Sequence, residues 1–179
     1  MINDDRVRIW NSFFHQARAE VLRLKRGDPA KAEFEPKGGR LTEEQQSILT
    51  VLVLCTLAIE ARANHMILEQ AEIGKLSKDE AYAAQRLPTL EKWILLPRLV
   101  GKRALVKTDS GPHQAIAEIC KRRNALVHVI FDKVTEDLPN KAKTISLFKS
   151  FVYAMEDMNV KLMRGVSRPR KSVLKLADI

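Results

Sequence analysis

Three side chains suited to acid–base and anion-binding chemistry, Arg123, Asn124 and His128, stand in an otherwise apolar stretch. An imidazole exchanges protons near neutral pH, and a guanidinium binds phosphate oxygens through two parallel N–H groups. In a helix, His128 lies about 140° around the axis and roughly 7.5 Å along it from Arg123. Both side chains can therefore converge on one phosphate lying over Asn124, and neither needs a metal ion for that task.

Arg123 falls in the middle of the apolar face that this helix is expected to bury. That face comprises Ile116, Ile119, Cys120, Leu126, Val127 and Ile130. A buried, unpaired guanidinium is costly, so Arg123 needs a carboxylate, a solvent-lined notch or an interface. Thr56, Glu60 and Asn64 form a polar line on another apolar helix, and we expect Glu60 or Asn64 to lie within hydrogen-bond reach of Arg123. A purely structural ion pair explains the same pattern and stays open as an alternative.

The elements that carry these residues belong to a chain whose composition predicts an all-α domain. Of 179 residues, 45% are apolar and 30% charged, with 7 Gly and 7 Pro, a balance typical of soluble helical proteins. Apolar residues recur at helical spacing over residues 5–25, 42–72, 77–85, 89–100, 110–131 and 141–164. We expect a helical bundle of about four to six helices over residues 1–164, followed by a basic tail over 165–179.

The second of these stretches predicts the long central helix of the bundle. Thr42, followed by two glutamates and Gln45, is a capping-box start, and the pattern then runs unbroken to about Glu72. In the fourth stretch, Pro97 should bend or end the helix.

The charge balance favours an anionic partner. The chain has 31 basic and 22 acidic side chains, a net charge of +9, which attracts nucleic acid. Lys102, Arg103, Lys121 and Arg122 are candidate RNA contacts, although a solvated helix face accounts for such runs as well.

No metal, cofactor or membrane signal stands out. His65 and Glu69 have the spacing of metal ligands, but no second pair accompanies them, so we interpret them as solvated side chains and expect neither a metal site nor a cofactor. The N-terminus lacks the apolar stretch of a signal peptide. The longest apolar run, residues 48–59, is shorter than the ~20 residues that span a bilayer. We expect a cytoplasmic protein without membrane contact.

The string Arg123-Asn124-Ala125-Leu126-Val127-His128 resembles the signature of the HEPN superfamily. That signature is an Arg followed by a polar residue, with a His four to six residues after the Arg, near the end of a long helix in an all-α chain. The resemblance extends loosely to the long helix that contains Glu60 and Asn64.

The resemblance implies a helical bundle that forms homodimers, so that two copies of the motif face one cleft. Many members are metal-independent endoribonucleases of toxin–antitoxin or antiviral systems, which implies RNA as substrate and an antitoxin or defence-system partner. His128 would act as acid and base, Arg123 would stabilise the phosphate, and Asn124 would orient either group. Some members are non-catalytic, so a helical binding or adaptor module using the same basic surface is the alternative.

Overall fold

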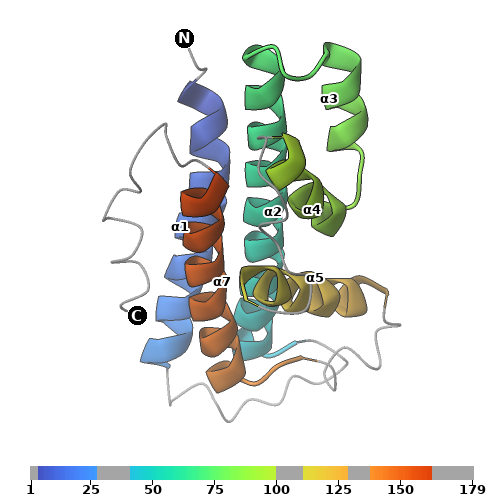
Figure 1. Cartoon of the computed structure of the whole chain (residues 1–179). Helices are drawn as coiled ribbons and strands as arrows, with labels where there is room; N and C mark the ends of the chain where they lie inside the picture. Colours follow the sequence, from blue (N-terminus) through green and yellow to red (C-terminus); the bar gives the residue numbers. More distant parts are fainter. Residues whose placement is uncertain (1–3, 28–40, 100–110, 129–137, 163–179) are drawn as a thin grey trace.

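The computed structural model of the chain describes residues 4–27, 41–99, 111–128 and 138–162 (Figure 1). Within these ranges the chain is all-helical, which confirms the predicted fold class. The helices are α1 (Asp4–Arg26), α2 (Glu43–Glu72), α3 (Lys78–Gln85), α4 (Thr89–Leu99), α5 (Pro112–His128) and α7 (Lys141–Leu162). The predicted tail, residues 165–179, lies outside the described ranges.

Helices α2 and α3 both begin at a capping box, and the sequence predicts the one at Thr42. The Thr42 hydroxyl accepts a hydrogen bond from the Gln45 backbone N–H at 3.1 Å, and the Gln45 side chain accepts one from the Thr42 N–H at 2.8 Å. Ser77 and Glu80 repeat the same reciprocal pair at the start of α3. Each box satisfies two backbone donors that a helix N-terminus otherwise leaves without partners.

Helix α2 is the centre of the bundle, as predicted. It runs antiparallel to α1, and α3, α4, α5 and α7 also pack against it (Figure 1). By length and composition this one helix among the described residues could also cross a membrane, but 61% of its apolar stretch is buried among the other helices. Such burial is typical of a core helix.

An aromatic cluster fills the space where α1, α2 and α7 meet. The ring of Phe14 on α1 lies 6.0 Å from Phe148 and 5.5 Å from Phe151 of α7, centroid to centroid. Trp10 packs edge-on against Phe14 at 6.5 Å. Ala17, with no exposed surface, lets the helices approach closely at the next turn of α1. Large rings beside a small residue give the interdigitated packing that a dense core requires.

Helix α4 continues through Pro97 and reaches Leu99. Pro97 therefore lies in its last turn. Trp93 and Leu96 have no exposed surface, as their helical spacing predicts, and they fix α4 against α2.

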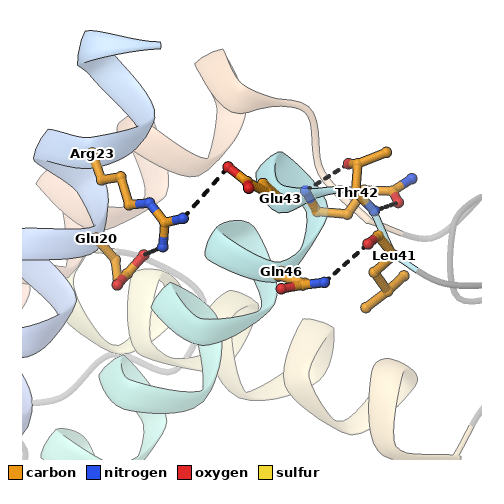
Figure 2. A network of polar contacts seen from close by, with 7 residues as sticks. Glu20, Arg23, Leu41, Thr42, Glu43 and Gln46 are labelled. Carbon is orange, nitrogen blue, oxygen red and sulfur yellow. Dashed lines mark hydrogen bonds and ion pairs between the residues drawn. The ribbon is translucent and has the colours of Figure 1, made fainter. Parts of the chain in front are cut away.

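Charged side chains join α1 and α2 near the connection between them. Arg23 lies 3.8 Å from Glu20 and 3.6 Å from Glu43, and Gln46 donates a hydrogen bond to the Leu41 carbonyl at 3.0 Å (Figure 2). Arg23 and Glu43 are both more than half exposed, so this ion pair adds little to stability. The buried apolar side chains hold α1 in place.

We therefore predict that Phe14→Ala lowers the free energy of unfolding by about 3–5 kcal/mol, because it leaves a cavity between three helices. Ile9→Ala on the same helix is the control, since 52% of Ile9 is exposed, and it should change the value by less than about 0.5 kcal/mol. Urea denaturation followed by circular dichroism measures both values. Similar losses in the two variants would contradict the packing.

Candidate functional site

Helix α5 carries the candidate site and crosses α2 at a steep angle (Figure 1). Its start is fixed by Gly111, with φ of 66°, and by Pro112 in the first helical position. The first half of α5 is buried, including Ile116 and Ile119. The C-terminal end projects beyond α2 on the side away from α1, so the helix becomes more exposed along its length.

Arg123 and Asn124 lie in the second half of α5, after the buried Cys120. Arg123 is half-buried and Asn124 is exposed, so the expectation that Arg123 sits within a fully buried face is wrong. Arg123 forms no hydrogen bond or ion pair with any residue that the structure describes. The backbone of His128 forms the end of α5, and its side chain lies outside the described part.

Arg123 and Glu60 lie in one neighbourhood, although they form no hydrogen bond or ion pair with each other. Both charged groups act on the buried thiol of Cys120, one turn before Arg123 on α5. The pKa of Cys120 is raised to about 11, mainly by burial. The charge of Arg123 partly opposes this increase, and the charge of Glu60 adds to it. A thiol with this pKa is neutral at pH 7.

The predicted pairing of Glu60 with Arg123 is nevertheless wrong. The Glu60 carboxylate accepts hydrogen bonds from the Thr89 hydroxyl and the Lys92 ammonium, both on α4. Lys92 is 1% exposed, whereas 34% of the Glu60 side chain is exposed. Lys92 is therefore the buried charge that Glu60 neutralises. The sequence pattern does not predict the burial of Lys92, because lysine is ordinarily a surface residue.

The other members of the polar line on α2 do not reach Arg123 either. The Thr56 hydroxyl donates to the Leu52 carbonyl of its own helix at 2.9 Å. The side-chain oxygen of Asn64 is buried and accepts no hydrogen bond from the part of the chain that the structure describes. Glu60 alone of the three binds another described helix.

The basic residues predicted as RNA contacts differ in whether their charge is free to bind an anion. Lys121 is exposed. The Arg122 Nε donates to Glu118 at 2.7 Å, one turn earlier on α5, so its charge is largely compensated. Lys102 and Arg103 lie outside the described residues.

A second charged cluster on α2 was missed by the sequence analysis. Arg62 is 5% exposed, and its Cζ lies 5.3 Å from the centroid of the Trp10 ring. The interpretation of His65 and Glu69 as solvated is wrong, because His65 is 4% exposed and its Nε2 lies 3.0 Å from Glu69 Oε1. Burial raises the pKa of Glu69, but contact with His65 and the charge of Arg62 outweigh it and leave the pKa below its ordinary value.

Within the described ranges, no three His, Cys, Asp or Glu side chains gather as metal ligands would. Comparison of the chain with protein-family models, with curated proteins and with solved structures finds no match.

We predict that Glu60→Ala lowers the free energy of unfolding by about 3–5 kcal/mol, because it leaves the buried Lys92 without its carboxylate. Lys92→Met should cost less, since water reaches the partly exposed Glu60. A Glu60→Leu/Lys92→Met double variant should recover most of the loss, because no buried charge remains. Urea denaturation measures all three, and a double variant no better than Glu60→Ala would contradict the assignment.

Proposed function

We propose that this chain is a metal-independent endoribonuclease of the HEPN type. The observation that carries the proposal is the state of Arg123, a half-buried residue in the second half of α5, with no carboxylate partner among the described residues. An uncompensated guanidinium beside the exposed amide of Asn124 suits a phosphate group. The motif also lies on one continuous helix of an all-helical bundle, as the family resemblance requires.

The proposed reaction uses the ribose 2′-hydroxyl as nucleophile. His128 accepts the proton of that hydroxyl as its oxygen bonds to the adjacent phosphorus, and the bond from phosphorus to the 5′-oxygen breaks. The His128 imidazolium then gives this proton to the leaving oxygen, which yields a 2′,3′-cyclic phosphate and a 5′-hydroxyl. Arg123 stabilises the charge that develops on the phosphorane oxygens, and Asn124 orients the phosphate.

Binding of the substrate is assigned to positive charge around the motif. Lys121 is exposed next to it, and the net charge of +9 attracts RNA over a distance of about one Debye length. Lys102, Arg103 and Arg122 remain candidate RNA contacts. A cytoplasmic location and a role in a toxin–antitoxin or antiviral system follow from the same proposal.

We expect cleavage of single-stranded RNA in the presence of EDTA, with a 2′,3′-cyclic phosphate as product. His128→Ala and Arg123→Ala should each reduce the rate by at least about 100-fold. The matched controls are His15→Ala, an exposed histidine on α1, and Arg23→Ala, whose side chain lies 3.6 Å from Glu43 and has no assigned role in RNA binding. Gel electrophoresis with end-labelled RNA measures the rates.

Three results of that assay would contradict the proposal. They are equal cleavage of RNA and DNA, a requirement for a divalent ion, and full activity of His128→Ala. Binding of RNA without cleavage by any preparation would instead support the non-catalytic binding module.

One motif offers a single guanidinium and a single imidazole, so we also propose that two copies of the chain form one site through a two-fold interface. We expect a mass of about twice 20.4 kDa by light scattering at micromolar concentration. Mixing inactive Arg123→Ala and His128→Ala chains should restore part of the cleavage activity, because the mixed dimer has one intact copy of each group. A monomer that is fully active would contradict a shared site.

A further inference from the structure

Helix α3 presents an aromatic ring between two cations on its outward face. Lys78, Tyr82 and Arg86 follow one another at intervals of four residues, and all three are exposed, Tyr82 by 62%. The Arg86 Cζ lies 5.3 Å from the centroid of the Tyr82 ring, a cation–π contact. Ala81 and Ala84, on the other side of α3, are buried in the core. The ring is therefore held on the surface by a helix that cannot turn it inward.

The acidic residues of α3 compensate this charge only in part. Glu80 accepts a hydrogen bond from the Ser77 backbone N–H at 2.7 Å, and this contact, which closes the helix cap, lowers its pKa. Asp79 is the remaining acid of the helix and is exposed. Lys75, in the turn before α3, adds an exposed positive charge. Cations thus outnumber acids around the ring.

The second tyrosine of the chain provides a contrast. Tyr153 on α7 is 55% exposed, so it resembles Tyr82 in accessibility. Its neighbours four residues away are Lys149 and Asp157, one of each sign. Only Tyr82 combines an exposed ring with cations on both sides.

Helix α3 and the end of the helix that carries the candidate site lie on the same side of α2, where one RNA strand could contact both. Both α3 and the C-terminal end of α5 lie on the side of α2 away from α1 (Figure 1). Both helices pack directly on α2. A strand whose phosphate lies at Arg123 can thus extend toward α3.

We infer that Lys78, Tyr82 and Arg86 form a stacking anchor for one base of single-stranded RNA. The base stacks on the open face of the Tyr82 ring, and the two cations contact phosphates on either side of it. Every base has a π-face, so such an anchor binds without sequence preference. This inference takes its ligand from the proposed function, and it adds a binding surface outside the catalytic motif.

The test uses the full chain labelled with 3-fluorotyrosine, which gives one ¹⁹F NMR signal for each of its two tyrosines. Tyr82→Phe removes one signal and so assigns both. The probe is a twelve-nucleotide 2′-O-methyl RNA, which cannot be cleaved through its 2′-oxygen. We expect the Tyr82 signal to shift on titration and the Tyr153 signal to stay. Movement of neither signal, or equal movement of both, would overturn the inference.

Affinity for the same probe gives the second readout. Tyr82→Ala should weaken binding about tenfold, Tyr82→Phe should retain it, and Tyr153→Ala should leave it unchanged. Lys78→Ala and Arg86→Ala should each reduce the salt dependence by about 0.7 in the slope of log K against log salt concentration. Unchanged binding by Tyr82→Ala would overturn the inference even if the wild-type chain cleaves RNA. Tyr82-dependent binding without any cleavage would support it and count against the proposed function.

Discussion

The burial of α2 is the constraint on which the rest of the structure depends. This helix has 30 residues, most of them apolar, and α1, α4, α5 and α7 cover it from different sides. Helix α1 runs along it and covers it over many turns, whereas α5 crosses it and covers only a few (Figure 1). A crossing helix longer than the contact must extend beyond it. The C-terminal end of α5 therefore projects beyond α2 on the side away from α1.

A helix so enclosed also buries the charges it carries, and each then needs a partner from the helix that covers it. Glu60 faces α4 and pairs with Lys92, which is itself almost fully buried. Arg62 faces α1 and lies over the Trp10 ring. These contacts are directional in a way that apolar packing is not, because a shift of α4 by one turn would separate Lys92 from Glu60. We infer that they help to select one arrangement of α1 and α4 on α2.

The sequence predicted the helices closely because their ends are set by local chemistry. The capping box at Thr42 marks the start of α2 within a residue, and helical spacing over residues 77–85 and 89–100 locates α3 and α4 to within about a residue. Periodicity gives the face on which a residue lies but not where a crossing helix leaves its neighbour. For this reason helical periodicity overestimates the burial of Arg123, and it predicts a partner for Glu60 on α5 although the partner lies on α4.

The incorrect prediction for Glu60 bears on the candidate site. If Glu60 had bound Arg123, the motif would be a structural ion pair, and the guanidinium would have no uncompensated charge for a ligand. Instead, Lys92 and Thr89 bind the Glu60 carboxylate, Arg122 binds Glu118, and the Cys120 thiol is neutral at pH 7. Among the described residues, each group near Arg123 that could supply a negative charge is engaged or uncharged. This is why we propose an external anion for the guanidinium, and a phosphodiester has the geometry to accept both of its N–H donors.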